Sequence, residues 1–177
     1  MPAVGTTAVV FPVPGADALL RAVAERFPGA VRTGFPAHIT VLYPFLQMSD
    51  VDDEVVAELA AMVARRHPLR VEFAVADEPR HLDEGFVALR PEPDAALREL
   101  TAELCARWGL LPYGGAYGEA EPHVTVALDV TPPQARAIAE RAAGDLPPPA
   151  DLDEAWLVVF DDAWSLRARL PLRGTAQ

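Results

Sequence analysis

Apolar and polar residues alternate in several short stretches of this chain, and segments with helical spacing of apolar residues separate these stretches. The alternation predicts β-strands at 6–12, 37–43, 69–75, 85–89, 123–126, 155–160 and 164–170. Apolar residues three and four positions apart predict helices at about 17–27, 49–66, 94–108 and 131–145. Proline and glycine mark the boundaries, as at Pro28 and Gly29 after the first helix.

Two of the predicted strands carry the same short pattern. Residues 38–41 read HITV and residues 123–126 read HVTV, and they hold two of the four histidines in the chain. In a regular strand His38 and Thr40 point to one face, as do His123 and Thr125. Chance predicts only about 0.2 His-x-Thr triplets for this content of histidine and threonine, so the repeat favours a shared function over two ordinary half-buried histidines.

The order of elements around the two motifs predicts the fold class. The motifs stand 85 residues apart (123 − 38), and each half of the chain supplies one of them. We expect an α+β fold with two intertwined lobes in a single domain spanning 1–177. Two antiparallel sheets would face a central cleft, with helices packed outside and a pseudo-twofold repeat relating the lobes. Each lobe would then contribute one His-x-Thr strand to the cleft.

Length and composition limit the class of protein. The chain has 177 residues, of which 51% are hydrophobic, enough for the packed core of one domain. No apolar run approaches the ~20 residues of a membrane span, and the N-terminus lacks the features of a signal peptide, so no membrane association is expected. Cys105 is the single cysteine and cannot form an internal disulfide, which favours a reducing cytoplasm.

The charge limits the partners. The net charge is −11 and every basic residue is an arginine. Such a surface repels polyanions, so duplex DNA is not an expected partner, whereas a small nucleotide or an RNA terminus is. A single arginine can still bind one phosphate, and Arg32 and Arg90 are candidates for this contact. We expect the protein to be a monomer.

Two histidines and two threonines on facing strands indicate acid–base chemistry on a phosphate ester. With an ordinary pKa near 6.5, one imidazole can accept a proton while the other donates one. The hydroxyls of Thr40 and Thr125 can donate hydrogen bonds to phosphate oxygens. His81 has no further ligands at a spacing suited to a metal, so neither a metal nor another cofactor is expected.

Aromatic residues near the motifs are candidates for contact with a nucleobase. Tyr113 and Tyr117 lie in a glycine-rich loop before the second motif, and Phe45 follows the first. Aromatic faces stack on any nucleobase. Tyr43 falls on the face opposite His38 if the strand is regular, which favours packing in the core.

The sequence around the motifs, PAHITVLYPF at 36–45 and EPHVTV at 121–126, resembles the 2H phosphoesterase superfamily and most closely its 2′–5′ RNA ligase-like branch. The resemblance implies the bilobal fold and the hydrolysis, or occasionally the reversible formation, of 2′,3′-cyclic or 2′–5′ phosphoester bonds without a metal. It also implies His123 as the base and His38 as the acid, although the symmetry of the motifs leaves the reverse open. Many relatives carry a basic residue soon after the second motif, where this chain reads ALD at 127–129.

Three other functions remain open from the sequence. The domain can bind a nucleotide or another phosphorylated ligand without processing it, or it can act as an RNA 2′–5′ ligase. Alternatively, the acidic helix around 50–58 can dock a basic partner, although such charge runs are usually solvated helix faces. Intact histidines favour an enzyme, because binding alone needs no acid–base pair.

Overall fold

The computed structural model describes residues 2–32, 34–76, 79–116 and 121–174. Its strands form one eight-stranded sheet in the order β6-β3-β4-β5-β2-β1-β7-β8, and every paired strand is antiparallel to its neighbour. The strands are β1 (Thr7–Pro12), β2 (His38–Leu42), β3 (Leu69–Val75), β4 (Val87–Glu92), β5 (Val124–Ala127), β6 (Ala150–Leu152), β7 (Glu154–Asp161) and β8 (Ala163–Pro171).

Helices connect most of the strands. They are α1 (Asp17–Arg26), α2 (Asp53–Ala64), α3 (Pro79–Asp83), α4 (Ala95–Trp108) and α5 (Pro132–Gly144), with 3₁₀ turns η1 (Pro14–Ala16), η2 (Met48–Asp50) and η3 (Pro112–Gly115). Local sequence sets several boundaries. The Asp52 carboxylate accepts the Val55 amide at the start of α2, and Thr131 forms a capping box with Gln134 at the start of α5. Gly109 ends α4 in the left-handed conformation that glycine adopts most readily.

The long elements confirm the sequence-based prediction, and the short ones differ from it. Helix α3 lies between the strands predicted at 69–75 and 85–89, where no element was predicted, and β6 was not predicted either. Both elements are too short to show a clear periodicity. The segment predicted as one helix at 49–66 divides into η2 and α2.

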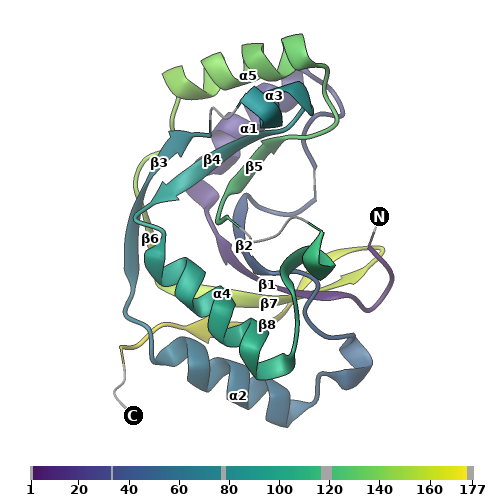
Figure 1. Ribbon diagram of the computed structural model, residues 1–177, viewed down its shortest axis with the longest axis vertical. Helices are drawn as coiled ribbons and strands as arrows, with labels where there is room; N and C mark the ends of the chain where they lie inside the picture. The colour runs from purple at the N-terminus through teal and green to yellow at the C-terminus, as the bar shows by residue number, and fades with distance from the viewer. Residues whose placement is uncertain (1, 33, 77–78, 117–120, 175–177) are drawn as a thin grey trace.

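One curled sheet replaces the two facing sheets that the sequence predicted. Strands β2 and β5, which carry the motifs, are direct neighbours at its centre, so the motifs meet edge to edge. Figure 1 shows β3, β4 and β5 above and β1, β7 and β8 crossing below them at a steep angle, with α3 and α5 at the top and α2 along the bottom. The α+β class and the antiparallel pairing are confirmed, while the pseudo-twofold relation stays a prediction.

Two helices each pack against a strand from the other half of the sheet. Helix α1 joins β1 to β2 yet packs against β5, and α4 joins β4 towards β5 yet packs against β2. The Thr101 hydroxyl on α4 donates a hydrogen bond of 2.9 Å to the Val41 carbonyl of β2. Each motif strand is therefore supported by a helix from the other half, which limits relative movement of the two motifs.

The two faces of the central strands have different environments. Ile39 and Val124 are fully buried in the main hydrophobic core, on the face covered by helices. His38, Thr40, His123 and Thr125 are half-buried on the opposite face, which we call the motif face. On β1 and β7 the motif face carries a second, smaller apolar cluster of Ala8, Val10 and Val158. No helix among the described residues is long and apolar enough to cross a membrane.

Candidate active site

The register between β2 and β5 brings the four motif side chains together. Ile39 is paired with Val124 in an antiparallel arrangement, which sets His38 opposite Thr125 and Thr40 opposite His123. Opposed residues in such sheets have Cα atoms about 4.5–5.5 Å apart, and diagonal neighbours such as the two histidines are roughly 7–8 Å apart. His123 lowers the pKa of His38 through charge repulsion, as expected for rings that share one site.

Both imidazoles are held by the same hydrogen bond. Nδ1 of His38 lies 2.8 Å from the Pro36 carbonyl oxygen, and Nδ1 of His123 lies 2.8 Å from the Glu121 carbonyl oxygen. A carbonyl oxygen only accepts, so Nδ1 carries the proton in each ring. Nε2 is consequently the atom that titrates: it accepts a proton in the neutral ring and donates one in the imidazolium.

A phenylalanine packs edge-on against each imidazole. The rings of Phe35 and His38 have centroids 5.0 Å apart at an angle of 73°, and those of Phe86 and His123 have centroids 5.3 Å apart at 85°. Phe86 follows Gly85, whose positive φ of 74° and close approach to the Val130 carbonyl leave no room for a Cβ atom. The two phenylalanines fix the ring planes that the backbone hydrogen bonds have oriented.

Burial controls the protonation of both histidines. Loss of solvation lowers the pKa of His38 and of His123 from the ordinary value of 6.5, and the backbone hydrogen bonds only partly oppose this effect. Repulsion from His123 and Arg32 adds to the lowering of the His38 pKa, and repulsion from His81 adds to that of His123. Both rings are therefore mainly neutral at pH 7 in the ligand-free protein.

We expect inorganic phosphate to raise the pKa of at least one of these histidines. A bound anion stabilises the imidazolium, so the titration midpoint moves upward, whereas burial alone keeps it below 6.5. The measurement is a proton NMR titration of the imidazole Cε1–H signals with and without phosphate, with chloride at equal ionic strength as the control. Identical midpoints in phosphate and chloride would show that no anion binds between the rings.

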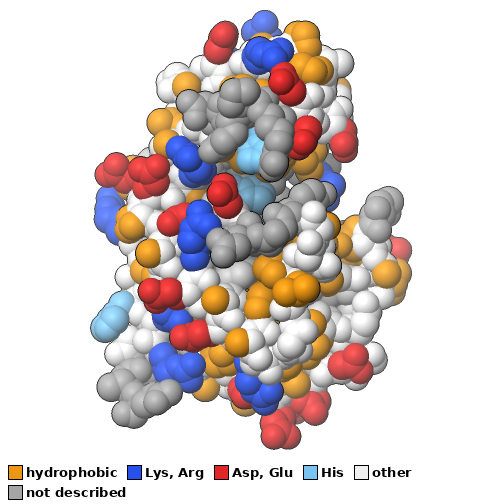
Figure 2. All heavy atoms as spheres, viewed as in Figure 1, with side chains coloured by type: hydrophobic (Ala, Val, Ile, Leu, Met, Phe, Trp, Pro, Cys, Tyr) orange, Lys and Arg blue, Asp and Glu red, His pale blue; other side chains and the backbone are white. Residues whose placement is uncertain are grey.

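The two threonines occupy the positions that the motif predicts. Thr40 and Thr125 are half-buried on the motif face, and within the described part of the chain no hydrogen bond occupies either hydroxyl. Figure 2 shows histidine side chains gathered in a hollow between the upper and lower parts of the molecule. This arrangement offers two Nε2 atoms and two hydroxyl donors to a single tetrahedral anion.

Residues 11–164 match the sequence model of the 2′-5′ RNA ligase superfamily. The chain belongs to this superfamily. No curated protein matches it.

Among solved structures, the fold of this superfamily member is similar to that of E. coli LigT complexed with 3′-AMP, at 18% identity and a TM-score of 0.58 over 94% of this chain and 97% of that one. It is also similar to TT0787 of Thermus thermophilus, at 16% identity and a TM-score of 0.55 over 97% and 100% of the two chains. A third structure, of a phosphoesterase, matches at 17% identity and a TM-score of 0.54 over 96% and 99%. At these identities the likeness establishes a shared fold.

A bulge in β2 changes which side chains reach the motif face after Thr40. Val10 of β1 pairs with Thr40, whereas the preceding Val9 pairs with Leu42, so Val41 is an extra residue in the strand. Val41 and Leu42 both lie in the main core. The alternation therefore shifts by one position beyond the bulge.

The shift changes the face on which Tyr43 lies, and Phe45 also differs from its predicted role. Tyr43 was expected opposite His38 but packs on the motif face, with its ring centroid 6.1 Å from that of Trp164. Phe45 was a candidate ligand contact, and this prediction is wrong: it is only 4% exposed and packs in the main core against Trp108. The bulge accounts for the placement of Tyr43. Phe45 lies beyond the end of β2 at Leu42, and it was a candidate only because it follows the first motif in the sequence.

The remaining candidates are placed as follows. Tyr113 lies in η3 next to Tyr43, with ring centroids 5.9 Å apart, and Tyr117 lies outside the described residues. Arg32 is exposed and close enough to His38 to lower its pKa. Arg90 is on β4, two residues from Ala88, which pairs with Thr125. Both arginines therefore lie near the motifs, as a contact with phosphate requires.

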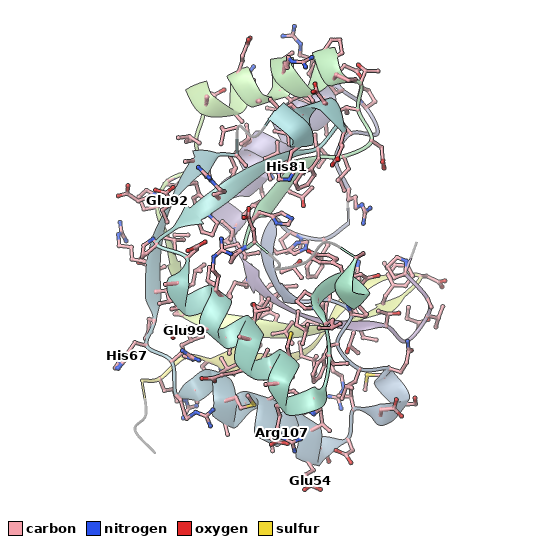
Figure 3. All side chains as sticks on the ribbon, in the orientation of Figure 1. Glu54, His67, His81, Glu92, Glu99 and Arg107 are labelled. Carbon is pink, nitrogen blue, oxygen red and sulfur yellow. The ribbon has the colours of Figure 1, made fainter. Side chains whose placement is uncertain are left out.

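Sequence reasoning missed His81, which Figure 3 labels above the centre of the molecule. It lies on α3, its ring 5.5 Å from that of Phe86, and its charge influences His123. No pattern in the sequence connects His81 to the second motif. Within the described residues no group of three or more His, Cys, Asp or Glu side chains is arranged to hold a metal ion.

Proposed function

We propose that this protein is a two-histidine phosphoesterase that hydrolyses 2′,3′-cyclic or 2′–5′ phosphodiester bonds of nucleotides or RNA ends. The observation that carries the proposal is the pair of imidazoles on neighbouring strands of one sheet face, each with Nδ1 bound to a backbone carbonyl. Two fixed, titratable Nε2 atoms on one face are what general acid–base catalysis needs. Membership of the 2′-5′ RNA ligase superfamily supports this chemistry.

The proposed reaction uses the histidines in opposite protonation states. Nε2 of His123 takes a proton from water while the water oxygen forms a bond to phosphorus. The bond from phosphorus to a ribose oxygen breaks, and Nε2 of His38 gives that oxygen its proton. One water is consumed, and a phosphomonoester and a free hydroxyl are released. Proton exchange with solvent then returns both imidazoles to their starting states.

The protonated state of His38 depends on the substrate. Burial lowers the pKa of His38 in the ligand-free protein, so its imidazole is mainly neutral near pH 7. The negative charge of a bound phosphodiester raises that pKa and supplies the acid form. Thr40 and Thr125 donate hydrogen bonds to the non-bridging oxygens, where negative charge accumulates in the transition state.

Charge and fold relatives both favour a small substrate. The net charge of −11 opposes long-range attraction of a polynucleotide, whereas Arg32 and Arg90 supply positive charge near the motifs. Structures of the similar E. coli LigT hold 3′-AMP, NADP⁺ and ATP. We infer a mononucleotide or an RNA terminus as the substrate, a monomeric enzyme and a cytoplasmic location.

Phosphorus NMR of the reaction products tests this function. The wild-type protein is incubated in the presence of EDTA with each of three substrates. These are adenosine 2′,3′-cyclic phosphate, a 2′–5′-linked diadenylate and its 3′–5′-linked isomer. We expect the cyclic phosphate or the 2′–5′ bond to be cleaved, the 3′–5′ isomer to stay intact and EDTA to have no effect. The resonance of the product shows which ester bond was broken.

The alternative functions give different results in the same experiment. Binding of these nucleotides without any turnover indicates a ligand-binding module and contradicts the proposal. Formation of a 2′–5′ bond from a cyclic phosphate end and a 5′-hydroxyl end, without hydrolysis, indicates a ligase. If EDTA abolishes turnover and added Mg²⁺ or Zn²⁺ restores it, the histidines alone do not carry the reaction, and the proposed mechanism is contradicted.

A further inference from the structure

The two halves of the motif face carry different side chains. Beside His38 lie four half-buried aromatic residues, Phe35, Tyr43, Trp156 and Trp164, which we call the aromatic wall. Phe35 joins the wall to the catalytic histidine, because its ring centroid is 5.0 Å from that of His38, 6.3 Å from that of Trp156 and 6.5 Å from that of Trp164. The ring of Tyr43 is 6.1 Å from that of Trp164.

The half beside His123 is lined differently. Ala88 pairs with Thr125, and the Ala88 carbonyl accepts a hydrogen bond from the Ala76 amide, so the two alanines are neighbours. Their small side chains form the floor of this half. Arg90 lies two residues further along β4. Phe86 packs against the His123 ring and against the His81 ring. The site therefore has an aromatic side, beside His38, and a side with small residues and Arg90, beside His123.

The aromatic wall lies at a suitable distance from the phosphate position. Val10 of β1 pairs with Thr40 on one side and with Trp156 on the other, so these three residues form a row across adjacent strands. Strands are about 4.8 Å apart, which puts the backbone of Trp156 about 10 Å from that of Thr40. The rings of the aromatic wall pack over Ala8, Val10 and Val158, so a ribose and its base would extend from the phosphate over the outer surface of these rings.

Neighbouring side chains hold Trp156 in place. Its Nε1–H donates a hydrogen bond of 2.8 Å to the Glu154 carboxylate, which also accepts Arg169 at 2.7 Å. The Arg169 guanidinium lies over the Trp156 ring, 5.3 Å from its centroid. A ring fixed in this way loses little conformational entropy when a ligand stacks on the wall.

We propose that the aromatic wall binds the nucleobase of the substrate and thereby places the ribose on the His38 side of the phosphate. The inference rests on the proposed function and specifies it: the substrate is a nucleoside phosphodiester, and a base-free sugar phosphate is a poor substrate. A planar heterocycle stacks on aromatic side chains, and purines do so more strongly than pyrimidines. With the ribose on this side, its leaving oxygen lies next to His38, the proposed acid.

The test compares adenosine 2′,3′-cyclic phosphate with 1-O-methylribose 2′,3′-cyclic phosphate, which has the same reacting group and no base. We expect wild-type kcat/KM to be at least tenfold higher for the adenosine substrate. Trp164→Leu should raise KM for that substrate on the order of tenfold with little change in kcat, and should leave the base-free substrate unaffected. Trp164→Phe retains an aromatic face and should restore most of the affinity. Leu146→Ala, an exposed apolar residue beyond α5, is the control for a general surface effect.

A binding measurement gives a readout that needs no turnover. Two of the three tryptophans belong to the wall, and the third is Trp108. Titration with 3′-AMP should quench the tryptophan fluorescence of the wild type, and it should not quench a Trp156→Phe, Trp164→Phe double variant, which keeps only Trp108.

The two proposals fail in different ways. If the wild type cleaves neither the two cyclic phosphates nor the 2′–5′-linked diadenylate, the proposed function is wrong. If it hydrolyses both with equal kcat/KM and 3′-AMP causes no quenching, the function stands and the base does not bind to the wall. The same conclusion follows if Trp164→Leu changes the kinetics of both substrates equally. A concentration-dependent dimer that Trp164→Leu abolishes, together with equal kcat/KM, would identify a second copy of the chain as the occupant.

Discussion

Replacing either His38 or His123 by alanine is expected to lower kcat on a 2′,3′-cyclic nucleotide by about 10²–10⁴-fold, the usual contribution of a general acid or base. In the proposed mechanism each ring carries one proton-transfer step through Nε2, because a backbone carbonyl occupies its Nδ1 atom. Initial rates measured with excess substrate give kcat directly. The double variant should lose less than the product of the two single effects, since the histidines act in one transition state.

The chain provides a matched control for these variants. His67 is an exposed histidine after α2, and Figure 3 shows it at the edge of the molecule away from the labelled His81. His67→Ala should therefore keep wild-type kcat. Circular dichroism and thermal unfolding test whether the His38→Ala and His123→Ala variants remain folded. Full activity in a folded variant of either motif histidine contradicts the mechanism.

The sequence contains the information for the strands and for the motif side chains, because both depend on local alternation. Ile39 and Val124 face the core as the alternation requires, which leaves the histidines and threonines on the other face. The four motif residues do share one face of the sheet. Two copies of one motif predict a common site, whatever the order of the strands between them.

Features that depend on contacts distant in sequence could not be predicted. Strands β2 and β5 pair in one sheet, and α1 and α4 each pack against the motif strand of the other half. The bulge at Val41 is visible only once β1 and β2 are paired, and it brings Tyr43 to the motif face. A bulge is defined by the pairing of two strands, so the sequence of one strand does not reveal it.

The aromatic wall illustrates the same limit. Trp156 and Trp164 lie well over a hundred residues from His38, on a hairpin whose own sequence indicates only two half-buried strands. They come close to His38 through Phe35, which contacts both tryptophans. The proposed chemistry therefore depends on short motifs that the sequence shows, whereas the proposed selection among substrates depends on side chains that only the fold brings together.

The second large effect is expected at the threonines. Thr40→Val and Thr125→Val each replace a hydroxyl by a methyl group of similar size on a strand that favours β-branched residues. Each change removes one hydrogen bond to the non-bridging oxygens, on which charge increases in the transition state. Loss of one such donor costs about 10²–10³-fold in kcat where the donor is well aligned. We expect effects near the lower end of this range, because each threonine is half-exposed to water that can partly replace the donor.

Serine at the same positions separates the hydroxyl from the rest of the side chain. Thr40→Ser and Thr125→Ser keep the donor and lose only a methyl group, so they should retain kcat within about tenfold of the wild type while the valine variants do not. KM should change less than kcat in the valine variants, because a bond that strengthens with charge acts mainly on the transition state. If the serine and valine variants lose activity equally, the threonines serve only to form the strands. The phosphate oxygens are then bound by other donors, and Arg32 and Arg90 are the next candidates. Arg32→Gln and Arg90→Gln measured in the same assay would then identify the anion-binding group.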